Sequence, residues 1–344
     1  MRKSTLKKLN EVAQSIDYLD PSFSFYNLRE VADRFADLHE ANTESAFGFL
    51  LRSSIQEFAN DVYQDLPVIY PGLVTVIAST RFSEVYGGLY RPVLPKQVDA
   101  GEPFQETTFK GFEREIRNYK FGHIEKFERE LFDDDQTGQI RTRAANLGEG
   151  FRIMEEIYVI KRLFGSSSTE DGVTMLASTY NSGTVFSDAI GNKLAAYARL
   201  TAASLEAAHI KARKMTDPLG RKFLTIPTTL IVSPDDEFNA WTLVNSPNQA
   251  WNSTGAYSHM VNPLQGRYTV AASPFVPQYA WMVGDPKRGF VFQRRDPLEI
   301  VQENPQSGGG FKMEIYAFRG RERFEADWVE PRFVILGNDG SVSS

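Results

Sequence analysis

The alternation of side chains over the last quarter of the chain, residues 290–329, most constrains what this protein can fold into. Apolar side chains occupy every second position of two stretches there: Phe311, Met313 and Ile315, then Phe324, Ala326 and Trp328. A period of two residues is typical of a strand with one buried face. The pattern predicts a strand, a loop, a long strand, a tight turn at Arg319-Gly320-Arg321 and a closing strand.

Helical periodicity marks the N-terminal residues and the middle of the chain. Apolar residues within 1–65 fall three and four apart, and the last segment of this kind covers about 43–63. The clearest helix is predicted over 133–165, where Asp135 caps the N-terminus and Gly165 ends the helix. One apolar stripe runs along it: Ile140, Ala144, Leu147, Phe151, Met154 and Tyr158.

The other segments mix strands, loops and shorter helices. Prolines and glycines interrupt short apolar runs over 66–103, which predicts strands and loops. The Ala- and Leu-rich residues 193–213 predict a helix. Residues 220–246 predict a strand, a proline turn, a second strand and a helix that begins near Ser233.

Residues 104–132 are dense in charges of both signs and fit two periods. The aromatic and apolar residues up to Tyr119 fall three and four apart, which favours a helix, whereas those after Tyr119 fit neither period cleanly. We expect a short helix or an irregular limb, followed by strands near 117–123 and 125–132.

Composition excludes several classes of function. The chain has 344 residues, a net charge of −6 at pH 7 and no cysteine. The acidic balance argues against a general nucleic-acid binder, whose affinity comes mostly from Lys and Arg on phosphates. Without cysteine there is no disulfide, thiolate zinc site or cysteine nucleophile. No apolar run reaches transmembrane length and the N-terminus lacks a signal-peptide core, so we expect a chain made in the cytosol.

No catalytic, cofactor or metal site is predicted. The four histidines lie far apart in the sequence: His39, His123, His209 and His259. Asp133, Asp135, Thr137 and Gly138 imitate the start of a calcium-binding loop, but Ala144 stands where a bidentate Glu belongs. We interpret this segment as a helix cap, with a metal as a minor alternative. The carboxylates of Asp235, Asp236 and Glu237 are interpreted as residues favoured by a helix N-terminus.

Several of these segments together resemble the Mu-like major head subunit of tailed phages. The C-terminal residues that carry the resemblance are Phe290, Gln293, Arg295, Pro297, Glu299, Phe311, Tyr316, Gly320, Arg321 and Trp328. Earlier in the chain they are Asp135, Gly138, Leu147 and Gly148, followed by the order of elements over 220–246. The resemblance covers about 104–335, roughly two-thirds of the chain. Each motif is weak alone, and their order and spacing are specific.

The resemblance implies an α+β capsid fold of the Hong-Kong-97 type. Its expected parts are a helical N-terminal arm at 1–65, peripheral-domain residues at 66–103, an extended β-hairpin loop at 104–132, the spine helix of the peripheral domain at 133–170, an axial domain at 171–289, and peripheral C-terminal strands and tail at 290–344. The first 65 residues match no motif, so a helical subdomain with its own core is the alternative to an arm lying on neighbours.

The function that the resemblance implies is structural and not enzymatic. It predicts a major capsid subunit that assembles with itself into hexamers and pentamers of an icosahedral shell around double-stranded DNA, without sequence-specific binding. Scaffolding, portal and decoration proteins are the further implied partners, with assembly in the host cytoplasm, no cofactor and no membrane. An encapsulin-like or gene-transfer-agent shell is the nearest alternative. A carboxylate-based hydrolase is a distant alternative. It needs two carboxylates about 5 to 9.5 Å apart in a cleft, and the sequence offers no motif for such a pair.

Charged residues are the candidates for contacts between subunits. Mixed charges set register and partner choice at interfaces, and arginines pair with carboxylates in bidentate geometry. The resemblance favours this role over a solvated surface. The candidates are Lys110, Arg114, Arg117, Lys120, Glu125, Lys126, Glu128, Arg129, Glu130, Arg294, Arg295, Arg319, Arg321 and Arg323.

Overall fold

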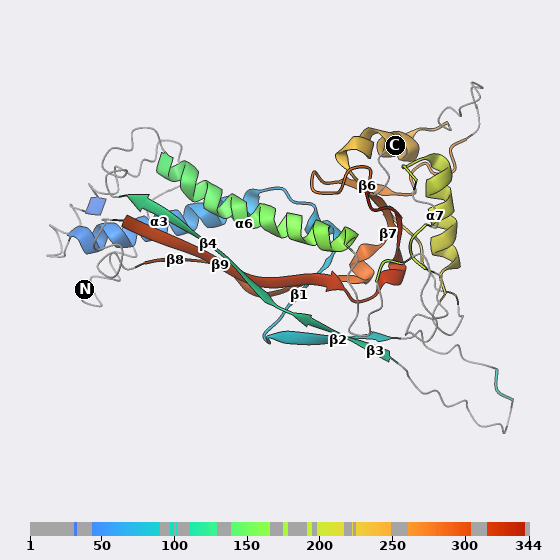
Figure 1. Ribbon diagram of the computed structural model, residues 1–344, viewed down its shortest axis with the longest axis horizontal. Coiled ribbons are helices and arrows are strands. Elements are labelled where there is room, and N and C mark those ends of the chain that lie inside the picture. The colour runs from blue at the N-terminus through green and yellow to red at the C-terminus, as the bar shows by residue number, and fades with distance from the viewer. Residues whose placement is uncertain are drawn as a thin grey trace. The chain divides into compact units, whose positions relative to one another are not determined.

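The computed structural model is an α+β protein (Figure 1). It describes residues 31–32, 43–89, 97–99, 101, 111–128, 139–165, 175–177, 191–194, 198–216, 222, 225–248, 261–303 and 315–340. The chain divides into two compact units, each assembled from segments distant in sequence. The first comprises Met1–Val68, Tyr119–Glu155 and Arg295–Phe324, and the second comprises Ile69–Asn118, Glu156–Arg294 and Glu325–Ser344.

Two long helices contribute to the core of the first unit: α3 (Thr43–Asp65) and the part of α6 (Gln139–Phe164) up to Glu155. Both were predicted. The predicted stripe on α6 is buried at Ile140, Ala144, Leu147 and Phe151, which are at most 4% exposed, and is only partly buried at Met154 and Tyr158. The helices approach closely at Gly148, where an added Cβ would lie 2.0 Å from the carbonyl oxygen of Ala59. The predicted cap Asp135 and most of the predicted N-terminal arm lie outside the described residues.

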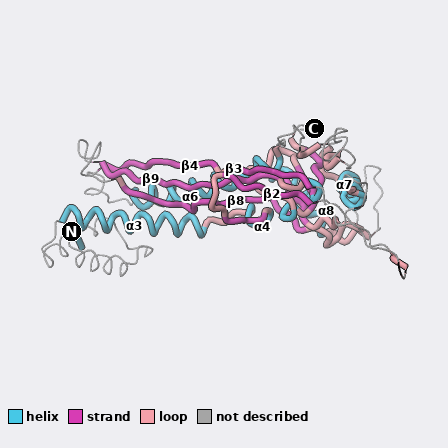
Figure 2. The backbone as a smooth tube through the Cα atoms, turned by 90° about the horizontal axis from the view of Figure 1, so that it is seen from below, coloured by secondary structure: helices cyan, strands magenta, loops and turns pink. Residues whose placement is uncertain are grey.

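A sheet with the strand order β1-β8-β9-β4 contributes strands to this core. Its strands are β1 (Thr75–Ala78), β8 (Phe290–Gln302), β9 (Ile315–Trp328) and β4 (Tyr119–Glu128). β4 pairs antiparallel with β9, β1 pairs parallel with β8, and Figure 2 shows β4, β9 and β8 side by side. Phe127, Ile300, Tyr316 and Phe318 bury their side chains with those of α3 and α6, so both helices cover the same face of these strands.

Strand β9 is continuous, so the predicted turn at Arg319-Gly320-Arg321 is wrong. These three residues pair with residues 122–124 of β4 in an unbroken register. Gly320 serves close packing instead, because a Cβ there would lie 2.3 Å from Cε2 of Phe151. The apolar positions predicted after it, Phe324, Ala326 and Trp328, are fully buried, but Glu325 and Asp327 between them are buried as well.

The predicted hairpin within 104–132 does not form among its described residues. β3 (Gly111–Arg117) pairs antiparallel with β2 (Ser83–Leu89), whereas β4 pairs with β9. β4 is also one strand without the predicted break, since pairing with β9 continues through Gly122 and Ile124. Pairing with distant strands overrides the local pattern here, as strand preference depends strongly on context.

The second unit has its own core on a sheet with the order β10-β7-β5-β6. Its strands are β10 (Val334–Asn338), β7 (Trp281–Gly284), β5 (Thr229–Val232) and β6 (Thr269–Ala272). The helices α7 (Ala202–Lys214) and α8 (Glu237–Asn245) share one buried cluster with Leu230, Val232 and Ile335, so both cover the same face. α7 contacts β10 and β7, whereas α8 contacts β6 and β5. The two helices therefore lie over opposite edges of this sheet.

Short helical turns complete the second unit. They are α4 (Tyr70–Leu73) and the 3-10 turns Pro234–Asp236, Pro286–Arg288 and Pro331–Phe333. Each has proline in its first turn. A backbone N–H at that position has no partner within the helix, so proline, which lacks this N–H, loses no hydrogen bond there.

Helix α7 begins later than the prediction from residue 193. It starts after Thr201 because Thr201 and Ser204 form a capping box, in which each hydroxyl accepts a hydrogen bond from the other residue's backbone N–H. Of the strand predicted early in 220–246, the described residues show an isolated bridge between Thr216 and Lys222. The second strand and the helix of that segment are confirmed as β5 and α8.

Candidate functional site

Most residues predicted for subunit contacts lie on strands β3, β4, β8 and β9. Lys110, Arg129 and Glu130 lie outside the described residues. Among the others, Arg114 is buried near the end of β9, a second set shares one exposed face of a sheet, and the remaining residues are dispersed.

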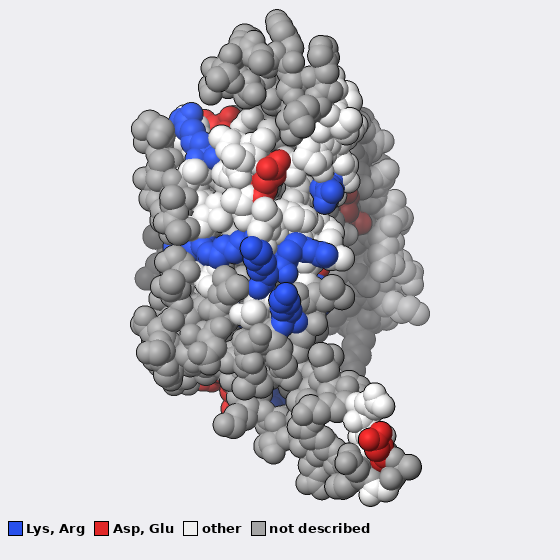
Figure 3. All heavy atoms as spheres, turned by 90° about the vertical axis from the view of Figure 1, so that its right-hand side faces the viewer, with Lys and Arg blue, Asp and Glu red and all other residues white. Residues whose placement is uncertain are grey.

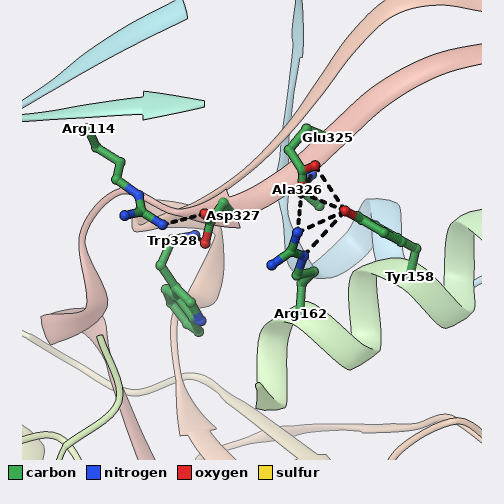
Figure 4. Close-up of polar contacts among 7 residues, drawn as sticks. All are labelled: Arg114, Tyr158, Arg162, Glu325, Ala326, Asp327 and Trp328. Atoms are coloured by element: carbon green, nitrogen blue, oxygen red, sulfur yellow. Dashed lines mark hydrogen bonds and ion pairs between the residues drawn. The ribbon is translucent and has the colours of Figure 1, made fainter. Parts of the chain in front are cut away.

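Arg114 is buried within the second unit, close to Asp327. Its Nη2 lies 2.5 Å from Oδ2 of Asp327, with the two side chains 9% and 12% exposed (Figure 4). Because a buried charge is stable only with a partner, this pair ties β3 to the end of β9. Its role is thus inside the subunit, unlike the inter-subunit contact predicted for Arg114. Arg117, further along β3, is exposed and contacts Glu115 at 3.0 Å.

A second, partly buried group joins α6 to the same strand end (Figure 4). The Tyr158 hydroxyl donates to Glu325 at 2.9 Å and accepts from Nη2 of Arg162 at 3.0 Å. Arg162 also lies 3.3 Å from Glu325. Burial raises the pKa of the Glu325 carboxyl and raises the pKa of Tyr158 to about 12, because desolvation disfavours the charged forms.

Sequence reasoning missed Glu325. A polar residue between the apolar positions of an alternating strand is expected to face solvent, yet Glu325 is 3% exposed. The available signal was Arg162, which follows Tyr158 by one helical turn and so lies on the same face of α6.

The arginines of β9 lie on the exposed face of the sheet. Tyr316 and Phe318 point into the core, so Arg319, Arg321 and Arg323 point to the opposite face, since side chains alternate along a strand. Arg321 lies 2.8 Å from Glu299 and Arg323 lies 3.8 Å from Asp296, both on β8.

Strand β4 adds two lysines to this face. Lys120 is directly opposite Arg323, and Lys126 is opposite Ala317. Like charges directly opposite each other destabilise a sheet. These two lysines, with Arg319, Arg321 and Arg323, define a basic sheet face, on which Arg321 and Arg323 already have acidic partners on β8.

The other predicted residues are dispersed. Glu125 lies 3.4 Å from His123 and 4.0 Å from Arg143 of α6, and Glu128 is exposed. Arg294 donates to the Tyr70 hydroxyl at 3.2 Å, and Arg295 is half-buried. The structure does not gather these residues with the basic sheet face into a single site.

Catalytic and metal chemistry find little support in the described residues. These residues contain no group of three or more His, Cys, Asp or Glu that could hold a metal. A pocket of about 270 Å³ between β4 and α6 is lined by Phe121, Gly122, His123, Asn146, Leu147, Gly150, Phe151 and Met154, and none of these is a carboxylate. This pocket thus lacks the paired acids of a hydrolase. No described helix is long and apolar enough to cross a membrane.

The acidic run at 235–237 starts a helix, as predicted. Asp235 and Asp236 lie in a 3-10 turn, and Glu237 begins α8. Asp236 is buried, and desolvation raises the pKa of its carboxyl. The Ser233 hydroxyl accepts from the N–H of Tyr279 and so does not cap the helix.

Comparisons with known proteins cover most of this fold. A model of the family described as phage capsid protein matches residues 113–336. The capsid of a native GTA particle aligns with a TM-score of 0.51 at 13% identity, covering 81% of this chain and 89% of that one. A chain of Microbacterium phage Oxtober96 aligns with a TM-score of 0.51 at 8% identity, covering 79% and 91%. These identities show a shared fold, and no curated protein matches the chain.

Proposed function

Because the chain belongs to the phage capsid protein family, we propose that it is a major capsid subunit that assembles with itself into hexamers and pentamers of an icosahedral shell. The match over 113–336, from β3 into β10, carries this proposal. Contacts between two different surfaces of one chain generate rings when the rotation closes. The functional site of such a subunit is the surface through which it contacts other copies of itself in the shell.

The described elements support an assignment of parts within a Hong-Kong-97-type subunit. α6 is the proposed spine helix, and the sheet of β10, β7, β5 and β6 with its two helices is the proposed core of the axial domain. The extended loop is moved from 104–132 to the segment 83–117, because β2 and β3 are the strands that pair with each other.

The basic sheet face is the proposed contact for carboxylates of a neighbouring subunit. Arg319 and Lys120 are exposed there, and acids of another chain would neutralise these two charges. Bidentate arginine–carboxylate pairs give such a contact a defined register. Arg117, Glu128 and the other exposed predicted residues remain proposed contacts of lesser weight.

The enclosed genome and the further partners are also part of the proposal. A net charge of −6 suits a wall that surrounds double-stranded DNA without holding it, since strong DNA binding depends on neutralising phosphates. Scaffolding, portal and decoration proteins are the expected partners during assembly in the host cytoplasm. The mature location is the virion.

A gene-transfer-agent shell is the second candidate, favoured by the likeness to the capsid of a native GTA particle. The two candidates share the fold and differ in cargo. Sequencing the DNA protected inside nuclease-treated particles separates them: one repeated viral genome indicates a phage, whereas random host fragments indicate a transfer agent.

Light scattering coupled to size exclusion tests the proposed assembly. We expect species of five or six subunits of 38.8 kDa, or closed shells, from the purified chain or from the chain with a scaffolding partner. A monomer that persists at every concentration, salt and partner tested contradicts the proposal.

A further inference from the structure

Two large aromatic side chains stand exposed on α8. Phe238 is 84% exposed and Trp241 is 62% exposed. They lie three residues apart, so they are neighbours on the helix surface and form one apolar patch. Exposed aromatic patches of this kind mark contact sites, and Trp is among the residues that most often dominate binding energy.

The patch points away from the neighbouring helix α7. Ala240, Leu243 and Val244 face the sheet, and the Asn239 side chain donates to the carbonyl of Leu200, just before α7. Successive helical residues are about 100° apart, so Trp241 lies about 200° around the helix from Asn239. The patch is therefore on the β6 side of the unit, flanked by the exposed carboxylates of Asp235 and Glu237.

The opposite side of the same unit is basic and carries an exposed aliphatic side chain. On α7, over β10, Ile210 is 53% exposed and Arg213 and Lys214 are exposed. Lys211 donates to the backbone of Lys193, which bridges to β10, so this surface extends to the β10 edge. Figure 3 views the side of Figure 1 on which α7 lies and shows several Lys and Arg side chains in a band across its middle, with others apart from the band.

We propose that α8 of one copy of this chain docks on α7 of the next copy. Phe238 and Trp241 pack against Ile210, while Asp235 and Glu237 face Arg213 and Lys214. This inference rests on the proposed function and names a contact that joins copies within a ring. An aromatic anchor bordered by complementary charges matches the anatomy of protein interfaces, and the charges select a second copy as the occupant.

The contact is heterologous, because two different surfaces of the chain meet. A heterologous contact leaves one free surface at each end of a chain of subunits until the ring closes. An isologous contact, by comparison, joins two copies of the patch and stops at a dimer. This difference gives the proposal a test that does not depend on loss of stability.

Cysteine crosslinking provides that test, because the chain has no cysteine of its own. Ile210→Cys and Trp241→Cys are introduced together, and assembled protein is treated with an oxidant or a short bis-maleimide before a non-reducing denaturing gel. We expect a ladder of covalent oligomers from the double variant and no crosslink from either single variant. A mixture of the two single variants before assembly should yield dimers and nothing larger.

Substitutions at the same surfaces provide a second readout. Phe238→Ser combined with Trp241→Ser should lower the association constant of the contact about 30-fold or more while the unassembled subunit keeps its melting temperature. Glu237→Lys should weaken assembly, and Lys214→Glu in the same chain should restore it. The conservative Trp241→Phe serves as the control that retains assembly.

The outcomes separate the inference from the proposed function. Intact particles without a ladder overturn the α8–α7 contact and leave the capsid function standing. Crosslinked dimers from Trp241→Cys alone also overturn it, since they show an isologous contact. Failure of every variant and of the parent chain to assemble overturns both.

Discussion

Replacing Gly148 by alanine should destabilise the subunit, whereas the same replacement at Gly150, two residues along α6, should stabilise it. Both glycines lie inside the helix, where exchanging glycine for alanine favours the folded state by about 0.5–1 kcal/mol. At Gly150 nothing lies within 4 Å of the added Cβ, so Gly150→Ala should show the full gain in stability from helix propensity.

At Gly148 the added Cβ meets the backbone of α3. It would lie 2.0 Å from the carbonyl oxygen of Ala59 and 2.9 Å from the carbonyl carbon, whereas real Cβ atoms stay beyond 3.0 Å. The helices must separate by about 1 Å, and overpacking of a core costs about 1–3 kcal/mol. The two variants should differ by this whole amount, because the helix-propensity gain is common to both.

Urea unfolding of the unassembled subunit, followed by far-UV circular dichroism, measures the difference. With equal slopes, the midpoint should fall for Gly148→Ala and rise for Gly150→Ala relative to the parent chain. Two variants of equal stability would refute the close approach of α3 and α6 at Gly148.

Three further predictions concern charged residues. Arg114→Ala leaves a buried carboxylate at Asp327 without this partner and should lower the free energy of unfolding by about 3–5 kcal/mol, whereas the exposed Arg117→Ala should change it by less than about 0.5 kcal/mol; equal thermal shifts would contradict this. The raised pKa of Glu325 means that the folded state holds this proton more tightly, so its contribution is full below the unfolded value of 4.5 and falls as pH rises through the folded pKa. The parent chain should therefore lose stability relative to Glu325→Gln as the pH rises above 4.5, and parallel pH profiles would show that burial does not shift the pKa of this group. Arg319→Glu should reduce the yield of particles without changing the melting temperature of the free subunit, and unchanged yield would remove the basic sheet face from the proposed contacts.

Local periodicity was sufficient to predict the main helices. The 3.6-residue stripe predicted buried side chains of α6 as far as Phe151, and the alternation after residue 323 predicted the apolar buried side chains of β9. The pattern fails where charged side chains are buried as well, at Glu155 and Glu156 of α6 and at Glu325 and Asp327 of β9.

The role of Gly320 and the pairing partners of β3 and β4 were not predictable from local sequence. Gly320 between two arginines is compatible with a turn or with a close approach, and only the position of Phe151, far away in the chain, decides. For the same reason β3 forms where a short helix or an irregular limb was expected, and β4 is one strand paired with β9 where two strands near 117–123 and 125–132 were expected. Long-range contacts determine the choice in each case.

The charged candidates were predictable as a class and not as individual roles. A dense mixture of charges indicates polar contacts, but it does not distinguish Arg114, buried against Asp327, from Arg117, exposed on the same strand. The burial of Glu325 depends on Tyr158 and Arg162 of α6, which no strand pattern can reveal.

Electron microscopy of the purified, negatively stained protein tests the central claim most directly. The account predicts closed shells, or rings of five and six subunits, visible without any further component or after a scaffolding partner is added. A field of uniform monomers or dimers, unchanged by protein concentration, salt or that partner, would contradict it.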